Sequence, residues 1–379
     1  MQSRTRATAA LAGIALLAGG TAFASNASAA TKAKAVTCAK GTEIDYVGPI
    51  TGPNGNLGVN ISRGADLAIA EFNKANKGCQ IVYKTQDTQG DPDQAILVVP
   101  KVISNKKVIG VVGPAFSGET DKTGKLFADA LLPSISPSAT RVSLSSNGWA
   151  TFHRALANDG KQGPGIAKQI SVLGGKKVGI IDDQSDYGKG LADIVKSTLG
   201  AAVVASDSFN DKATDFSAAI TKMKSGGVDT IFFGGYYAQA GPLTKAIRAA
   251  GLTATVVFGD GVLDQGYIDG AGPDGEGAII TCTCAPTDAN PTFLASYKAK
   301  FNDTPKTYGP EAYDAANALL DGIKAGKTTR KALNDYLKTY NKQGVTKVLK
   351  WDATGEVAGE AVYAYKVVSG KITPLGLIK

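Results

Sequence analysis

Short apolar runs typical of buried strands alternate along the chain with longer amphipathic segments typical of helices. The first half predicts strands at residues 44–47, 80–85 and 108–113 and helices at 62–73 and 92–104. The second half predicts strands at 177–181, 202–206 and 230–234 and helices at 188–199 and 215–224. Alternation of this kind is the signature of a layered α/β fold with parallel strands.

The two halves also match in their connections. Residues 87–92 lead into one predicted helix and residues 211–215 lead into its counterpart, and each connection carries aspartates near the helix start. Aspartate there caps free backbone N–H groups. Order, spacing and capping together favour a duplicated two-lobe architecture over one continuous sheet.

Two of the predicted strands end in polar side chains of a size suited to contacting a ligand. Strand 108–113 runs into Pro-Ala-Phe-Ser-Gly at 114–118, and residues 230–235 run into Tyr-Tyr-Ala-Gln at 236–239. Open parallel sheets bind ligands at the carboxyl ends of their strands. Two such ends in two similar halves predict a binding cleft between two lobes.

The last part of the chain must complete both lobes. A helix is predicted at 310–325 and strands at 347–350 and 361–368. We expect the chain to cross between lobes near 158–161, 284–290 and 341–344, and three crossings would act as a hinge. The predicted N-terminal lobe is 36–157 with 287–343, and the predicted C-terminal lobe is 158–286 with 344–379.

The first 29 residues have the composition of a secretory signal peptide. Arg4 and Arg6 precede an apolar stretch at 7–17, and Ala-Ser-Ala at 27–29 forms a small-residue cleavage site. No later segment reaches the length of about 20 apolar residues that a membrane span needs. We expect an exported protein in the periplasm or on the extracellular side of the membrane, and Cys38 lies too far along the chain for a lipid anchor.

Composition narrows the function classes further. The chain has 379 residues and a formal net charge of +8, carried mainly by dispersed lysines. Dispersed charge of this kind predicts a solvated surface. It does not predict nucleic-acid binding, which needs a basic stripe interleaved with aromatics. The length favours two domains of ordinary size.

The four cysteines, an even number, suit an oxidising compartment. Cys38 and Cys79 each lie at a predicted strand start, and we expect them to form a disulfide. Cys282 and Cys284 could close a small loop, stay reduced or bind metal. With His153 as the only histidine the chain lacks ligands for a zinc site, so we expect no metal or cofactor and a structural role for His153.

Motifs of exported or nucleotide-dependent enzymes do not fit. Ala115 stands where a nucleophile elbow around Ser117 needs glycine, and Asp321 stands where a phosphate loop ending in Gly-Lys-Thr at 326–328 needs glycine. A dinucleotide fingerprint is not formed at 110–118 either. We therefore expect a protein that is not an enzyme, with an exported enzyme of unfamiliar site as the alternative.

Several segments together resemble the branched-chain amino-acid binding proteins of ABC transporters. They are GPITGP at 48–53, DTQGDPDQ at 87–94, SPSAT at 136–140, DYGKG at 186–190 and FGGY at 233–236. The resemblance covers nearly the whole mature chain. It implies the type I periplasmic-binding fold, an α/β fold of two doubly wound Rossmann-like lobes joined by a three-stranded hinge.

The resemblance also implies a site for each end of an amino acid. Ser117, Ser138, Ala139 and Thr140 match the segments that hold the ligand carboxylate, and a helix beginning near Ser117 would present free N–H groups to that anion. Asp260 matches the acidic residue that holds the ammonium. Read without the resemblance, the Ser and Thr residues are caps or turn residues and Asp260 belongs to an Asp-Gly turn.

Aromatic residues are expected to close the site. Tyr187 and Tyr236 match tyrosines of the second lobe that cover the ligand, and Tyr308 falls near the position of a wall aromatic. Tyrosine suits such a place because its ring covers apolar atoms while its hydroxyl finds a partner. Leu57 stands where the family has a tyrosine, a departure that should change the side-chain pocket.

The expected function is to bind a branched-chain amino acid, or a similar small zwitterion, and deliver it to a membrane permease driven by its ATPase. The expected protein is a monomer without a nucleic-acid partner. The alternatives are a sensor that presents the solute to a membrane receptor, and a binder of an amide, urea or an aromatic acid.

Overall fold

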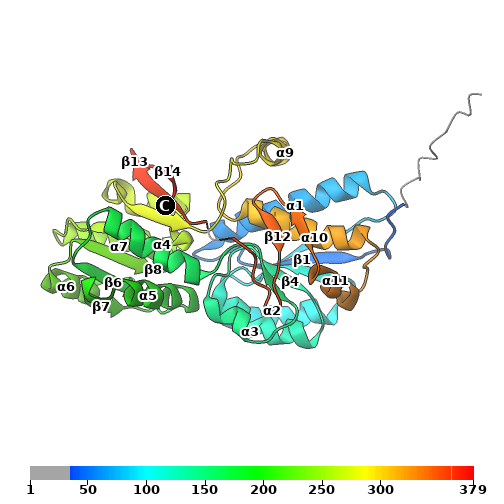
Figure 1. Cartoon of the computed structure of the whole chain (residues 1–379), viewed down its shortest axis with the longest axis horizontal. Coiled ribbons are helices and arrows are strands. Elements are labelled where there is room, and N and C mark those ends of the chain that lie inside the picture. The colour runs from blue at the N-terminus through cyan, green and yellow to red at the C-terminus, as the bar shows by residue number, and fades with distance from the viewer. Residues whose placement is uncertain (1–34, 360) are drawn as a thin grey trace, which may run out of the picture. The chain divides into compact units, whose positions relative to one another are not determined.

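The computed structural model describes residues 35–359 and 361–379, so the predicted signal peptide lies outside the described residues. The described chain contains two main sheets, each packed between helices (Figure 1). We call each sheet with its helices a lobe. Among the described helices, none has the length and apolar character needed to cross a membrane.

The first lobe is built on a parallel sheet with the strand order β2-β1-β3-β4-β5. Its strands are β1 (Glu43–Gly48), β2 (Val82–Asp87), β3 (Val108–Val112), β4 (Ser134–Ser136) and β5 (Phe152–Arg154). Its helices are α1 (Gly55–Ala75), α2 (Pro92–Ser104), α3 (Ser117–Asp129), α9 (Pro291–Phe301), α10 (Gly309–Lys324) and α11 (Arg330–Leu337). Helices α1 and α10 lie together on one face and α2 and α3 on the other (Figure 1).

The second lobe is built on a seven-stranded sheet with the order β14-β13-β10-β9-β8-β6-β7. Its strands are β6 (Val178–Asp182), β7 (Val203–Ser208), β8 (Thr230–Gly234), β9 (Thr255–Phe258), β10 (Ile279–Cys282), β13 (Tyr363–Val368) and β14 (Lys371–Leu377). Its helices are α4 (Asp159–Val172), α5 (Asp186–Leu199), α6 (Ser217–Gly226), α7 (Tyr237–Ala249) and α8 (Gln265–Ala271).

Alternating side chains of the second sheet divide its core between two faces, because successive residues of a strand point to opposite sides. Phe232 and Val257 pack with the residues of α4 and α5. Their neighbours Phe233 and Phe258 pack with the residues of α6, α7 and α8. Burial on both faces explains why the strands read as continuous apolar runs.

Five parallel strands of each lobe have the same order when numbered within their lobe: second, first, third, fourth, fifth. This doubly wound order confirms the predicted duplication. The strand order reverses between β1 and β3 in the first lobe and between β6 and β8 in the second. Such switch points are where α/β sheets bind ligands.

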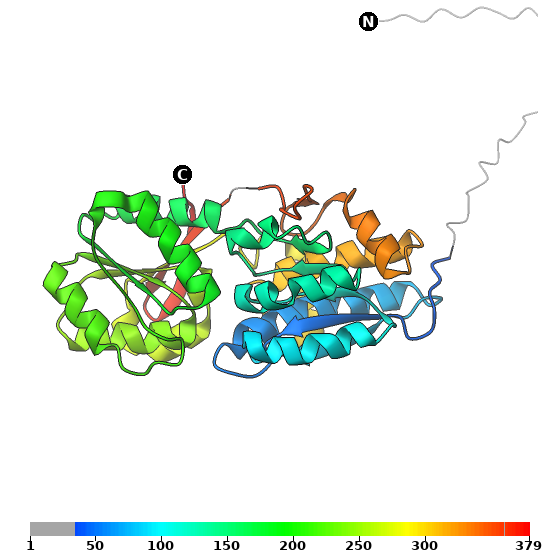
Figure 2. The same ribbon diagram turned by 90° about the horizontal axis from the view of Figure 1, so that it is seen from below.

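Segments distant in sequence complete each lobe, as the colours in Figure 2 show. The late helix α10 packs on α1 of the first lobe, and β13 pairs with β10 of the second. The chain passes to the second lobe between β5 and α4, returns between β10 and α9, and passes again before β13. Thr283 of the second passage donates a hydrogen bond to the Ala157 carbonyl of the first, at 2.9 Å.

The C-terminal part of the described chain departs most from the expected elements. We expected strands at 347–350 and 361–368 to close the chain as a pair, but β12 (Val348–Lys350) pairs with β11 (Asn341–Gln343), and β13 pairs with β14. Strand β14 was not predicted because Pro374 and Gly376 interrupt its pattern. Proline is tolerated there because β14 is an edge strand. The predicted domain boundaries remain a prediction.

Both cysteine pairs are bridged. The Cys38–Cys79 disulfide, with an S–S distance of 2.01 Å, is the one we expected. Cys282 and Cys284 are also bonded to each other, at 2.03 Å, which decides among the three possibilities for that pair. His153 is buried against Trp351, and burial lowers the pKa of its imidazole to about 4, as expected of a packed, neutral side chain.

Candidate functional site

The two switch points place the loops that follow β3, β6 and β8 around one region. Ser117 is the first residue of α3, Tyr187 lies in the first turn of α5, and Tyr236 caps α7. Each helix starts directly after a buried strand, so its first turn is held at the carboxyl edge of its sheet. The strand-end pattern in the sequence predicted this region, and its role in ligand binding remains a prediction.

In the first lobe, the predicted serines connect neighbouring loops. The Ser117 hydroxyl accepts from the Arg141 N–H at 3.2 Å, and the Ser138 hydroxyl donates to the Ala115 carbonyl at 2.6 Å. Ala139 is buried, and its carbonyl accepts from the Arg154 guanidinium at 2.9 Å. These bonds hold the segment after β4 against the start of α3.

Thr140 differs from its neighbours because its hydroxyl is fully buried and makes no hydrogen bond within the described chain. A buried hydroxyl without a partner is costly, since it has given up its bonds to water. The Thr140 hydroxyl does lower the pKa of the nearby Asp159 carboxyl, so the two side chains face each other, and their remaining hydrogen-bonding capacity is available to a ligand atom.

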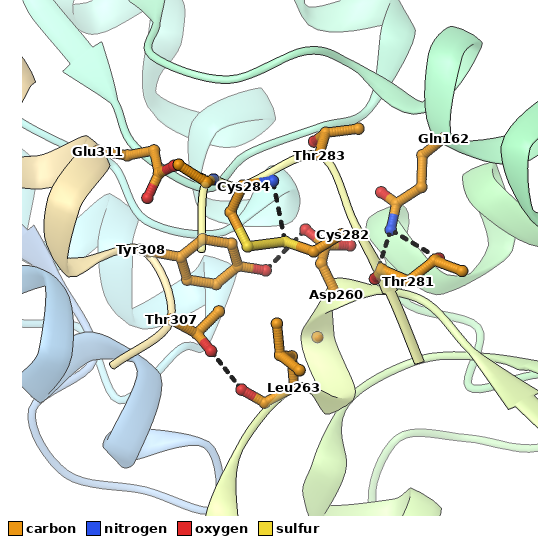
Figure 3. The surroundings of a disulfide bond; sticks show 12 residues. Gln162, Asp260, Leu263, Thr281, Cys282, Thr283, Cys284, Thr307, Tyr308 and Glu311 are labelled. Atoms are coloured by element: carbon orange, nitrogen blue, oxygen red, sulfur yellow. Dashed lines mark hydrogen bonds between the residues drawn. A yellow bond between two sulfur atoms is a disulfide. The ribbon is translucent and has the colours of Figure 1, made fainter. Parts of the chain in front are cut away.

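Asp260 joins the two lobes. It is fully buried, and it accepts from the Tyr187 hydroxyl at 2.6 Å and from the Tyr308 hydroxyl at 2.7 Å. Tyr187 belongs to α5 of the second lobe. Tyr308 precedes α10 of the first lobe and lies next to Asp260 in Figure 3. Burial raises the pKa of Asp260. The structure thus brings together three residues that are far apart in the sequence.

Asp159 is a second buried acid, and it was not among the predicted site residues. It is the first residue of α4, its backbone N–H donates to the Thr140 carbonyl at 2.9 Å, and neither oxygen of its carboxyl has a partner in the described chain. Burial, and then the negative charge of Asp260, raise its pKa to about 8. Aspartate at a helix start is common, so the sequence carried no signal beyond capping.

A row of aromatic rings forms the wall next to these acids. The ring centroids of Tyr187 and Tyr236 are 5.0 Å apart, and those of Tyr236 and Phe116 are 4.6 Å apart. Phe116 precedes Ser117 and was not among the predicted site residues, because an apolar residue after a strand reads as core. Leu57 is fully buried in the first turns of α1, and its contact with a ligand remains a prediction.

A cavity of about 450 Å³ lies outside the aromatic row, between loops of both lobes. The first lobe contributes residues from the starts of α2 and α3, and the second contributes residues from the start of α5, from the loop after β7 and from α7. Gly118, Tyr187 and Tyr236 line it. The cavity therefore adjoins the predicted ligand region.

Polar contacts across the cleft keep the lobes closed. Arg141 of the first lobe forms an ion pair with Asp186 of the second. Elsewhere the Asn56 amide donates to the Asp264 carboxylate at 2.9 Å, and the Thr307 hydroxyl donates to the Leu263 carbonyl. The described structure is thus a closed arrangement.

Replacing Asp186 with asparagine should weaken closure slightly. Both side chains of the Arg141–Asp186 pair are 32% exposed, so the pair contributes about 1 kcal/mol at most. We expect affinity for a cleft ligand to fall about two- to fivefold, with a smaller loss at high salt. Calorimetric titration at low and high salt measures both effects. Asp193→Asn, which breaks the exposed pair with Lys189 on α5, should change neither. An equal loss in both variants would remove the role of the cross-cleft pair.

Comparison with known proteins agrees with this architecture. The sequence profile of the periplasmic binding protein family matches residues 43–371. Leu/Ile/Val-binding protein homolog 3 of Brucella melitensis is 30% identical over 347 residues, which span 88% of this chain and 93% of the relative. The leucine-, isoleucine-, valine-, threonine- and alanine-binding protein of Pseudomonas aeruginosa is 32% identical, spanning 83% of this chain and 87% of the relative.

Solved structures give the same result. The branched-chain amino acid transporter substrate-binding protein of Streptococcus pneumoniae, in complex with isoleucine, matches with a TM-score of 0.82 and 30% identity, covering 89% of this chain and all of the other. A leucine-binding protein of Thermotoga maritima, 23% identical, supports the fold with a TM-score of 0.81. The chain therefore belongs to the periplasmic binding protein family and has the predicted type I fold. This family is a class of solute-binding proteins, not a class of enzymes.

Proposed function

We propose that this chain is an extracytoplasmic solute-binding protein that closes on an α-amino acid, or a similar small zwitterion, and presents it to the permease of an ABC importer. The observation that carries the proposal is a set of buried acceptors with unused hydrogen-bonding capacity. The Asp159 carboxyl and the Thr140 hydroxyl interact only with each other and form no well-formed hydrogen bond in the described chain, and both lie close to Asp260. Three polar atoms in such a place are typical of a site for a ligand with several N–H donors.

An ammonium group fits these acceptors. It carries three N–H donors and one positive charge, and Asp159 and Asp260 supply negative charge from which water is excluded. Charge-assisted hydrogen bonds of this kind are about twice as strong as neutral ones. In the proposed complex the Tyr187 and Tyr308 hydroxyls continue to orient Asp260, so its carboxylate meets the ammonium in a fixed position.

The carboxylate of the ligand would bind at the start of α3. The first N–H groups of a helix have no partner within the helix and carry a partial positive charge. Ser117 is the first residue of α3 and is buried, and Gly118 follows it. The charged ends of a zwitterion would then be met from the first lobe and from the acids of the second.

The relatives indicate which amino acids to test first. The Brucella and Pseudomonas relatives carry leucine, isoleucine and valine in their names, and branched-chain amino acids are therefore the first candidates here. We also propose, from the family, that the ATPase of the importer drives transport, that the chain is a monomer, and that it works in the periplasm or outside the cell without catalysing a reaction. Isothermal titration of the mature chain against all amino acids tests the proposal, and no binding by any of them would reject it.

Amino-acid binding should release protons near neutral pH. The pKa of Asp159 is raised to about 8 in the empty protein, so its carboxyl is mostly protonated at pH 7. A bound ammonium favours the carboxylate, lowers that pKa and expels the proton. We expect release of up to about one proton at pH 7 and an affinity that rises between about pH 6 and pH 8. Calorimetry in buffers of different ionisation enthalpy measures the released protons.

Asp159→Asn is the control, and it should abolish the proton release while weakening binding. Proton release by the variant equal to that of the native chain would show that another group titrates. The stability of the empty protein provides a second check, because its pH dependence has the opposite sign to that of the affinity. Since folding raises the pKa of Asp159, its contribution to stability is present at low pH and is lost as pH rises through about 8.

A further inference from the structure

We infer that the 450 Å³ cavity outside the aromatic row receives the cationic end of a ligand side chain, so that the preferred amino acid carries an ammonium or guanidinium group beyond a short aliphatic spacer. The inference rests on the proposed function, because it assumes that the head group binds at Asp159 and Asp260. It adds the chemistry of the side chain.

Two acceptors in the cavity wall lack a donor within the described chain. Asp183, directly after β6, is fully buried; its Oδ1 accepts from the Ser185 N–H at 2.9 Å, whereas its Oδ2 has no partner. Gln239 on α7 donates through its amide to the Asp211 carbonyl, and its Oε1 is buried without a partner. Both residues line the cavity. Two unpaired acceptors favour a ligand group that donates, which an aliphatic side chain cannot do.

The charges around the cavity favour a cation over a neutral donor. Asp186 is paired with Arg141, and Asp91 is 3.7 Å from Lys212, the single basic residue in the described lining. No cation of the described chain pairs with Asp183 or Asp211. Within the same described residues, Glu119 accepts only from the Thr88 hydroxyl and the Phe116 N–H. Burial raises the pKa of Asp183 to about 7, the direction expected of a carboxyl that no cation faces.

The aromatic row suits the spacer between head group and cation. Tyr187 lines the cavity and also donates to Asp260, so it separates the two places by one side chain. Methylene groups can lie along the rings of Tyr236 and Phe116, which also line the cavity. A cation near an aromatic face gains further attraction from the ring.

Pairs of amino acids with equal chains and different ends test the inference. L-ornithine and L-lysine are titrated against L-norvaline and L-norleucine by calorimetry on the mature chain. We expect each cationic amino acid to bind at least tenfold tighter than its apolar match. Tighter binding of norvaline and norleucine would overturn the inference and leave the proposed function standing. Failure of ornithine and lysine while another amino acid binds would likewise overturn only the inference, whereas failure of every amino acid in the titration would reject the proposed function itself.

Charge changes at Gln239 locate the cation. Gln239→Glu should tighten ornithine binding and Gln239→Lys should weaken it at least tenfold, while norvaline changes less than twofold with either. Asp183→Asn should weaken ornithine in the same way, with Asp182→Asn, which alters the adjoining carboxylate outside the described lining, as its matched control. Because Asp183 also accepts from the N–H of Ser185, the residue that caps α5, the two Gln239 variants decide the test if Asp183→Asn fails to fold. Equal effects on ornithine and norvaline would overturn the assignment.

Discussion

Asp260→Ala is expected to weaken amino-acid binding by about 2 to 5 kcal/mol, a loss of at least about thirtyfold. The ligand ammonium would stay buried beside the Tyr187 and Tyr308 hydroxyls, which would no longer have a carboxylate to orient. A buried charge that loses its partner carries a cost larger than that of a lost surface contact. Calorimetric titration with the best amino acid of the native chain measures the loss.

The same substitution should not weaken the empty protein. Asp260 is fully buried and its pKa is raised by burial, so the ionised group is held there at a cost to folding. The Tyr187 and Tyr308 hydroxyls lose their acceptor, which offsets this gain, so we expect the melting temperature of unliganded Asp260→Ala to stay close to that of the native chain. Asp269→Asn, an exposed acid on α8, is the control and should alter neither affinity nor melting. Native affinity in Asp260→Ala would remove Asp260 from the site.

The fold was predictable because each step of it leaves a local pattern. Strands buried on both faces gave apolar runs at β3 and β8, and Asp91 at the start of α2 does cap that helix, accepting from the N–H groups of Asp93 and Gln94. The short strands β4 and β5 escaped detection because three residues carry no readable period. Partners in the sheet, more than local preference, hold them extended.

The candidate site was predictable only in part. The family resemblance placed Asp260 and Tyr308 in one site, and the structure brings them within hydrogen-bonding distance. Asp159 was missed because what distinguishes it is unsatisfied hydrogen bonding, and that depends on what packs around it. Burial of this kind arises from segments that meet across the sequence, so no local pattern reports it.

Gly113 shows how the first lobe fixes Ser117, and Gly113→Ala should be among the most damaging single changes. Its φ angle is +119°, and a Cβ atom there would overlap the Val47 carbonyl oxygen. That oxygen accepts from the Ala115 N–H at 3.1 Å, so it cannot move without shifting the segment that leads to Ser117. Backbone strain and overlap each cost about 1 to 3 kcal/mol, and we expect a combined loss of about 3 to 5 kcal/mol of unfolding free energy.

Gly148→Ala separates the two causes, because Gly148 also has a positive φ, +71°, but has open space around it. It should lose only about 1 kcal/mol and keep native ligand affinity. Urea unfolding measures the free energies, with midpoints that shift while the slope stays constant. Ligand affinity should fall in Gly113→Ala alone, since only there does the start of α3 move. If both variants lost the same free energy, the close approach of β1 to this loop would not be what holds Ser117 at the cleft.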